Sequence, residues 1–116
     1  MTFEAFDTVV VPFPFTDRTA AKRRPALVLS GAAFNGSAGH VVLAMITSAK
    51  NAPWPLDVPI TDREAAGLTA ESVVRMKLFT LDARLVLRKA GQLASDDVSS
   101  VKATLTELIY NPRVIA

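Results

Sequence analysis

Four basic side chains lie within seven residues near the start of the chain. They are Arg18, Lys22, Arg23 and Arg24, and no acidic residue follows Asp17 in this stretch. A guanidinium is well shaped to hold a phosphate group through two parallel hydrogen bonds, and basic side chains supply most of the affinity of proteins for nucleic-acid backbones. The stretch therefore favours a phosphate-binding surface, although a basic run of this length is equally typical of a solvated loop.

A second group of candidate residues follows an apolar stretch in the middle of the chain. Thr47 ends that stretch, and the polar segment after it carries Lys50 and, between Pro53 and Pro55, Trp54. A threonine hydroxyl can donate a hydrogen bond to a phosphoryl oxygen, and an exposed indole can stack on an unpaired base. A threonine at a strand end and a tryptophan packed in the core or against a second subunit are the structural alternatives.

Several kinds of active site are excluded by composition. The chain has no cysteine, so it has no disulfide, no thiolate zinc site and no cysteine nucleophile. His40 is the sole histidine, which excludes a pair of histidines acting as acid and base within one subunit, and any metal site that needs several imidazoles. We expect His40 to be a strand-end residue, and we expect neither a metal ion nor a cofactor.

Length and composition indicate one ordinary globular domain over residues 1–116. Half of the residues are apolar, 21% are charged and the formal net charge is +2, a balance too mild to indicate a nucleic-acid partner by itself. No stretch approaches the ~18 consecutive apolar residues that a membrane span needs. The segment Met1 to Asp7 has two acidic residues and no basic one, unlike a signal peptide. A cytoplasmic location without membrane attachment is expected.

The first strand is expected over residues 8–15, where Val9, Val11, Phe13 and Phe15 share one face. Both phenylalanines are expected in the core. The two prolines on the other face cannot donate hydrogen bonds to a neighbouring strand, so this end should lie at a sheet edge or open into the basic loop that follows.

Further strands are expected at 25–31, 40–47, 56–60 and 72–79, with a looser one at 85–93. The strands at 25–31 and 40–47 are almost wholly apolar, which is typical of strands covered on both faces.

Helical signals lie mainly at the end of the chain. An apolar stripe with helical spacing indicates a C-terminal helix; it comprises Val98, Val101, Leu105, Leu108 and Ile109. Asp96 and Asp97 would occupy its first turn, and Pro112 would follow its end. This stripe is expected to contact the core or a second subunit.

Two shorter turns are also expected. Thr61 and Glu64 match a capping box before a helical turn that Gly67 can end, and Asp82 can cap another turn. The pattern predicts an α+β or mainly β fold, in which a small curled antiparallel sheet or SH3-like barrel packs against a C-terminal α-helix.

Five segments in this order resemble the MazF/PemK/Kid toxins. The segments are Val-Pro-Phe-Pro-Phe-Thr-Asp at 11–17, Lys-Arg-Arg-Pro-Ala-Leu-Val-Leu-Ser at 22–30, Ile-Thr-Ser at 46–48, Gly-Leu at 67–68 with Ser-Val-Val-Arg at 72–75, and Thr-Leu-Asp at 80–82. Each segment alone is weak evidence for the family. All five occur in the same order, and the resemblance extends over about residues 7–108.

The resemblance implies the toxin of a type II toxin–antitoxin system with a CcdB/MazF-like SH3-like barrel. Members of this family are homodimers that cut single-stranded RNA sequence-selectively, without a metal, and leave a cyclic phosphate; an antitoxin protein neutralises them. Two of the family's catalytic positions match this chain, at Arg24 and Thr47. The resemblance and the basic composition together suggest RNA contacts by Arg18, Lys22, Arg23, Lys50, Trp54, Arg75 and Lys77.

Two departures from the family pattern stand out. Some members carry an acidic residue after Val-Val-Arg, whereas this chain has no carboxylate there and Lys77 lies nearest to the position. The identity of the general base is therefore open, with Asp17 the nearest carboxylate by motif and a turn residue as its alternative role. Phe6-Asp7 replaces the Gly-Asp of many members, which should affect only the turn.

Two other functions remain open at this point. A non-catalytic toxin of the CcdB type, which binds DNA gyrase, shares the barrel fold. A degenerate relative could bind RNA or an antitoxin without cutting, which the missing acidic residue near Lys77 would allow. The basic loop and the Arg-Pro and Ile-Thr-Ser motifs favour the nuclease, because a pure protein binder does not need them.

Overall fold

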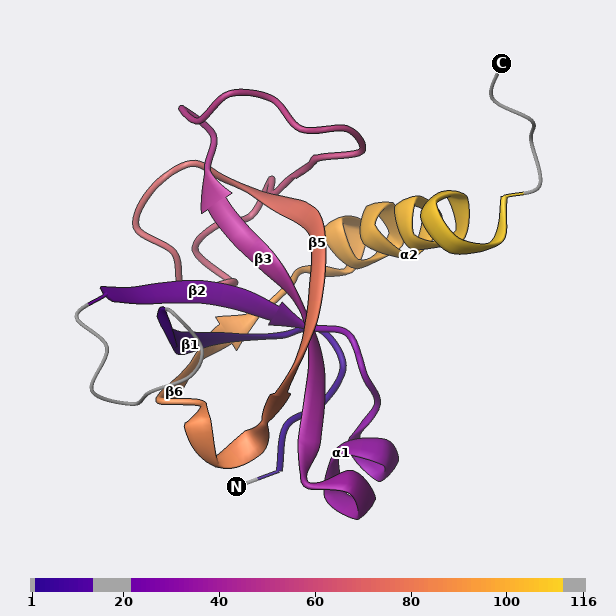
Figure 1. Cartoon of the computed structure of the whole chain (residues 1–116). Coiled ribbons are helices and arrows are strands. Elements are labelled where there is room, and N and C mark those ends of the chain that lie inside the picture. Colours follow the sequence, from indigo (N-terminus) through magenta and orange to yellow (C-terminus); the bar gives the residue numbers. More distant parts are fainter. Residues whose placement is uncertain (1, 14–21, 112–116) are drawn as a thin grey trace.

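The computed structural model describes residues 2–13 and 22–111, which form a curled sheet with two helices (Figure 1). The elements in chain order are β1 (Asp7–Phe13), β2 (Lys22–Val28), α1 (Ala32–Ala38), β3 (His40–Ser48), β4 (Val58–Pro59), β5 (Ser72–Asp82), the 3-10 turn η1 (Ala83–Leu85), β6 (Arg88–Gln92) and α2 (Ser95–Tyr110). None of the described helices is long and apolar enough to cross a membrane.

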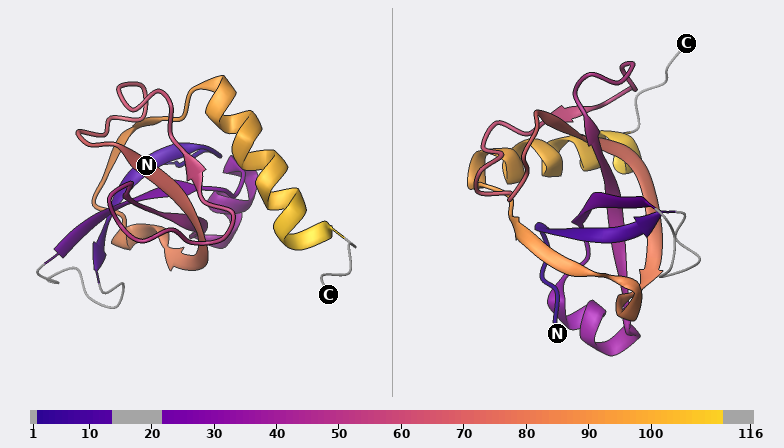
Figure 2. Two further views of the ribbon diagram at one scale, coloured as in Figure 1. Left: turned by 90° about the horizontal axis from the view of Figure 1, so that it is seen from above. Right: turned by 90° about the vertical axis from the view of Figure 1, so that its left-hand side faces the viewer.

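The described strands form one antiparallel sheet of six strands in the order β4-β5-β3-β2-β1-β6. Figure 2 shows that the sheet curls strongly and that α2 lies across one side of it. The expected class, a small curled antiparallel sheet with a C-terminal helix, is confirmed.

Hydrophobic side chains fill both faces of this sheet. Alternation along β2 sends Ala26 and Val28 into an inner cluster with Val9 and Leu43, and sends Leu27 into an outer cluster that α2 covers. Both faces are covered along most of β3 and from Ala26 to Val28 of β2, and these segments are almost wholly apolar, as predicted. β2 itself begins earlier and ends earlier than the predicted strand at 25–31, because the basic residues Lys22–Arg24, expected in a loop, pair with β1.

The end of β1 is paired on one side only, as its prolines predict. β6 pairs with β1 from Asp7 to Val10, whereas β2 continues alongside as far as Phe13. Pro12 therefore lies beyond the β6 ladder. Pro14 and Phe15 lie outside the described residues.

Helix α1 is not indicated by the sequence pattern. Its seven residues carry no apolar stripe, and it is held by the buried Asn35. The Asn35 amide donates to the carbonyls of Phe3 at 2.9 Å and Ser30 at 3.0 Å, and its Oδ1 accepts from the Ser30 hydroxyl at 2.5 Å. A tertiary hydrogen-bond network therefore fixes a helix that propensity does not predict.

The expected capping box at Thr61 and Glu64 is wrong. The Thr61 hydroxyl donates to Asp97 Oδ1 at 2.7 Å, and Asp62 Oδ1 accepts the Ala65 N–H at 3.0 Å instead. The result is a turn without a regular helix, which ends at Gly67 with a φ of +70°, as predicted. The Thr61 hydroxyl binds the distant Asp97 instead of capping the turn that follows it.

The expected cap at Asp82 is confirmed. Its carboxylate accepts the Arg84 N–H at 2.9 Å at the start of η1.

Candidate functional site

The inner face of the sheet changes from apolar to polar along two neighbouring strands. On β2 this face carries Val28, Ala26 and then Arg24, and on β3 it carries Met45 and then Thr47. Ala26 pairs directly with Met45, so the strands are in register at the point of change. Alternation alone therefore brings the two predicted catalytic side chains to the same rim of the inner core.

Arg24 and Thr47 line one cavity of about 380 Å³ at this rim. Four further residues of its lining come from β5: Arg75, Lys77, Leu78 and Phe79. Figure 1 places the end of β3 and the beginning of β5 at the end of the sheet opposite α1. The cavity unites residues from β1, β2, β3 and β5, which lie as far apart in the sequence as Phe13 and Phe79.

A β-bulge in β5 includes Lys77. Ala44 pairs with Leu78, but the next residue, Met45, pairs with Arg75, so Met76 and Lys77 are extra residues on β5. Bulges re-aim side chains and recur next to active sites. Alternation places Arg75 and Lys77 on the face that lines the cavity and Met76 in the outer core, and the bulge leaves Lys77 without a paired residue on β3.

The charged side chains in the described lining of this cavity are all cationic. They are Arg24, Arg75 and Lys77, and neither a carboxylate nor an imidazole accompanies them among the described residues. The Arg24 guanidinium carbon lies 5.5 Å from the centre of the Phe13 ring. Phe13 is 37% exposed and lines the cavity, so the expectation that it belongs to the core is wrong. At the end of β1 the inner face of the sheet is therefore exposed to solvent and no longer covered by core side chains.

Arg75 is engaged by the loop between β3 and β4. Its Nε donates to Asp57 Oδ1 at 3.1 Å, and its Nη2 donates to Asp57 Oδ2 at 3.0 Å and to the Ala52 carbonyl at 2.8 Å. The hydrogen-bonded guanidinium lowers the pKa of Asp57, which keeps the carboxylate ionised. Arg75 therefore connects the loop to β5.

This connection presents Trp54 to solvent beside the cavity. Its backbone N–H donates to Asp57 Oδ2 at 3.0 Å, and its ring is 42% exposed. Lys77 Nζ lies 4.4 Å from the ring centre, within cation–π range. Trp54 therefore does not pack in the core of this chain, which was one of its two structural alternatives.

Asn51 joins the site although the sequence pattern does not single it out. Its Nδ2 donates to Thr47 Oγ1 at 2.5 Å, and it lines the same cavity. A hydroxyl that accepts from Asn51 keeps its own hydrogen free to donate to a ligand. The available signal is its position four residues after Thr47, but an asparagine in a loop more often serves the turn itself.

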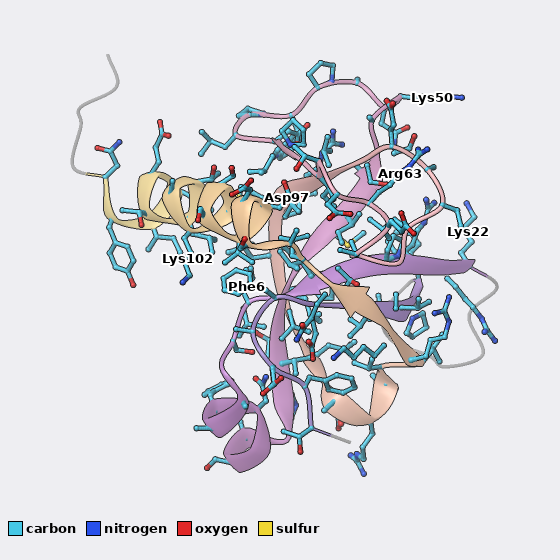
Figure 3. All side chains as sticks on the ribbon, turned by 180° about the vertical axis from the view of Figure 1, so that it is seen from behind. Phe6, Lys22, Lys50, Arg63, Asp97 and Lys102 are labelled. Carbon is cyan, nitrogen blue, oxygen red and sulfur yellow. The ribbon has the colours of Figure 1, made fainter. Side chains whose placement is uncertain are left out.

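The other predicted contact residues lie outside this cavity. Lys50 lines a neighbouring cavity with Arg63 and Glu71, Arg23 points to the opposite face of β2, and Lys22 is exposed at the start of that strand. Figure 3 shows Lys22, Arg63 and Lys50 on one side of the molecule, away from Lys102 on α2. Asp17 and Arg18 lie outside the described residues.

The described residues do not offer a cluster of metal-binding side chains. Within residues 2–13 and 22–111, three or more histidine, cysteine or acidic side chains do not gather at any point. His40 is exposed at the start of β3, with Nδ1 3.0 Å from the Ala38 carbonyl, as expected of a strand-end residue.

Comparison with protein families gives one match over nearly the whole chain. Residues 4–109 match the family described as PemK-like, MazF-like toxin of type II toxin–antitoxin systems. The chain belongs to this toxin family. Arg24, Thr47 and the cavity that they line all lie within the matched residues of the PemK/MazF domain.

Solved structures of MazF proteins have the same fold. The chain is 27% identical to MazF from Deinococcus radiodurans, with a TM-score of 0.73 over 94% of this chain and 97% of that one. It is 25% identical to a chain of the MazE–MazF complex of the same organism, with a TM-score of 0.74 and coverage of 95% and 97%.

A more distant likeness concerns the fold alone. A chain of a mycobacterial endoribonuclease in complex with its cognate antitoxin is 14% identical, with a TM-score of 0.73 over 97% of this chain and 98% of that one. No curated protein sequence matches the chain at a significant level.

Proposed function

We propose that this toxin is a metal-independent endoribonuclease that cuts single-stranded RNA, including mRNA, at selected sequences and thereby inhibits translation and growth. One observation carries the proposal. Arg24 and Thr47, which match the family's catalytic positions, line one open cavity although they lie on different strands. Membership of the family and the cationic lining of this cavity support the same conclusion.

RNA cleavage through its own 2′-oxygen has three requirements. The 2′-proton must be removed, the negative charge on the pentacoordinate phosphorus must be stabilised, and the leaving 5′-oxygen must be protonated. In the proposed mechanism the Arg24 guanidinium stabilises the charge and the Thr47 hydroxyl, oriented by Asn51, donates to a phosphoryl oxygen. A role as general acid is only the second one proposed for Arg24, because a guanidinium holds its protons tightly and is a poor proton donor.

Lys77 and Trp54 are proposed to bind the RNA beside the scissile phosphate. Lys77 adds a positive charge to the cavity, and the exposed Trp54 ring offers a surface on which a base can stack. Arg75 contributes by holding the loop that carries Trp54, since its donors already bind Asp57 and Ala52. The cations Arg18, Lys22, Arg23 and Lys50 are proposed to attract more distant phosphates.

The proposed partners are a single-stranded RNA substrate, a second copy of the chain and a cognate antitoxin protein, in the cytoplasm and without a cofactor. Related structures support the antitoxin, because the Deinococcus protein is described as a MazE–MazF complex. The proposed homodimer rests on family membership and on the exposed apolar end of α2.

The decisive experiment incubates purified protein with a long single-stranded RNA in excess EDTA and maps the fragment ends. The wild type should give discrete cuts that end in a cyclic phosphate. Arg24→Ala should lower the rate by about 100-fold or more, because it removes a preorganised electrostatic donor. Arg84→Ala is the control: this arginine pairs with Asp82 outside the cavity lining, and its loss should leave cleavage unchanged.

Two outcomes would contradict the proposal. Full activity of a folded Arg24→Ala variant, checked by thermal melting, would remove this residue from the mechanism. Intact RNA with folded, antitoxin-free wild type on several transcripts would favour a toxin that binds its target without cutting it.

A further inference from the structure

A second cationic cavity lies on the other face of β2. It has a volume of about 300 Å³, and its lining includes Arg23, Arg24 and Arg88. Arg24 also lines the first cavity, so the two hollows share a wall. We call this second cavity the arginine groove.

Strand register explains why two distant arginines meet there. Val10 of β1 pairs with Pro25 on one side and with Arg88 on the other, and Pro12 of the same face pairs with Arg23. Residues that pair across an antiparallel ladder point to the same face. Arg23 and Arg88 therefore project from one surface of three adjacent strands.

The far wall of the groove is fixed by backbone contacts that only glycine permits. Gly67, with a φ of +70°, lies so close to the Ala90 carbonyl that a Cβ would collide with it, and a Cβ on Gly91 would collide with the carbonyl of Ala65. The Thr8 hydroxyl also donates to the Ala66 carbonyl at 2.6 Å. The turn before Leu68 is thus held on β6, which forms the groove without a ligand.

The cations of the groove are available to a ligand. Within the described part of the chain, Arg23 and Arg88 make neither a hydrogen bond nor an ion pair through their side chains, and the described lining of the groove contains no carboxylate. The adjacent Lys89 behaves differently, because its Nζ lies 3.2 Å from the buried Asp7. Both arginines are exposed.

We propose that the arginine groove binds phosphates of the same RNA strand that flank the scissile phosphate. This inference rests on the proposed function. Paired guanidiniums fit phosphate oxygens, and a strand held at Arg24 can continue into either cavity, because that residue lines both. The groove extends the RNA-binding surface to Arg88, a residue on β6 that no sequence motif indicates.

The test measures binding of a long single-stranded DNA, which has no 2′-hydroxyl and cannot be cut through it, at several salt concentrations. The variants are Arg88→Gln, Arg23→Gln and the double variant. Lys102→Gln on α2 is the control, because it removes the same charge far from the groove. The double variant should bind about 10-fold more weakly near physiological salt. Each lost phosphate contact should lower the slope of log K against log salt by about 0.7.

RNA cleavage by the same variants gives a second readout. Arg88→Gln should lower kcat/KM mainly through KM and leave the mapped cut positions in place, because the groove holds phosphates and reads no bases. Lys102→Gln should match the wild type in both experiments.

Each failure identifies which proposal is wrong. Cleavage by the wild type together with equal affinities of Arg88→Gln and Lys102→Gln would overturn the groove alone. Absence of cleavage would overturn the nuclease, while the DNA-binding measurement would still decide the groove. Loss of antitoxin binding by Arg88→Gln with unchanged nucleic-acid affinity would make the groove a surface for an acidic protein segment and overturn the proposal.

Discussion

At the scale of single residues, Phe6 has a backbone conformation that is unusual for its residue type. Its φ of +69° lies in the left-handed region, which glycine adopts readily and a phenylalanine does not. Its N–H donates to the Val28 carbonyl at 2.6 Å and its carbonyl accepts the Leu93 N–H at 3.0 Å, so both neighbours fix the strained conformation. The ring packs on the outer core, and Lys102 Nζ lies 5.6 Å from its centre.

We therefore predict that Phe6→Gly is more stable than Phe6→Ala by about 1 kcal/mol. Both variants lose the ring, but only glycine relieves the left-handed strain. Urea unfolding measures the difference.

At a position without left-handed strain, a glycine should make the protein less stable than an alanine does. Ala103→Gly on the exposed side of α2 should destabilise by about 1 kcal/mol. Equal stability of the two Phe6 variants would show that the backbone is not strained at this position.

At the scale of elements, Asp97 attaches α2 to the rest of the molecule. Its carboxylate is 2% exposed and accepts hydrogen bonds from the Thr61 N–H, the Thr61 hydroxyl and the Asp62 N–H. Burial alone would raise the pKa of Asp97, but these hydrogen bonds outweigh it and lower the pKa. The position in the first turn of the helix also favours the negative charge.

Asp97→Asn should cost about 1–3 kcal/mol of unfolding free energy at pH 7, since an amide group then faces these donors. Because the folded-state pKa is lowered, the contribution of Asp97 is complete above the unfolded value of about 4 and is lost as the pH falls through the folded-state pKa. The difference between wild type and variant should therefore shrink below about pH 4 in urea titrations.

Asp96→Asn supplies the matched control for this prediction. It removes the same charge from the same turn, but Asp96 is exposed and does not accept those bonds. A cost at pH 7 as large as that of Asp97→Asn would attribute the effect to charge rather than to the attachment of the helix.

At the scale of the whole molecule, the apolar stripe of α2 is buried in its first half and exposed in its second half. Val98, Val101 and Leu105 pack on the outer core, whereas Leu108 and Ile109 are exposed, Ile109 at 56%. The expectation that the stripe contacts the core is thus confirmed for its first half. The exposed end is the part of the helix that the proposed homodimer can use.

Sedimentation should show a wild-type particle with twice the mass of the chain. Ile109→Glu should weaken the dimer at least 10-fold without lowering the melting temperature of the monomer, because a charge would enter the proposed interface. Ala103→Glu on the other side of the helix should have no such effect. A monomeric wild type at high concentration would refute the homodimer, and an unaltered Ile109→Glu dimer would place its interface elsewhere.

The sequence by itself determined the elements whose signals are local. Alternation located β1, almost wholly apolar runs located β2 and β3, the apolar stripe located α2, and Gly67 and Asp82 marked turns. These signals are local, because a side chain's direction follows directly from the period of its element. Alternation also carries Arg24 and Thr47 to the same face once their strands pair. The family motifs could therefore propose both residues as candidates without coordinates.

Only the tertiary structure decided the features that depend on distant contacts. The bulge that leaves Lys77 unpaired with β3 and the meeting of Arg23 with Arg88 in one groove arise from strand register, which joins residues far apart in sequence. Asn35 fixes α1, and Asp97 takes the hydroxyl of Thr61 away from the expected cap. These outcomes could not be read from a local pattern, because in each case a partner tens of residues away provides the deciding interaction.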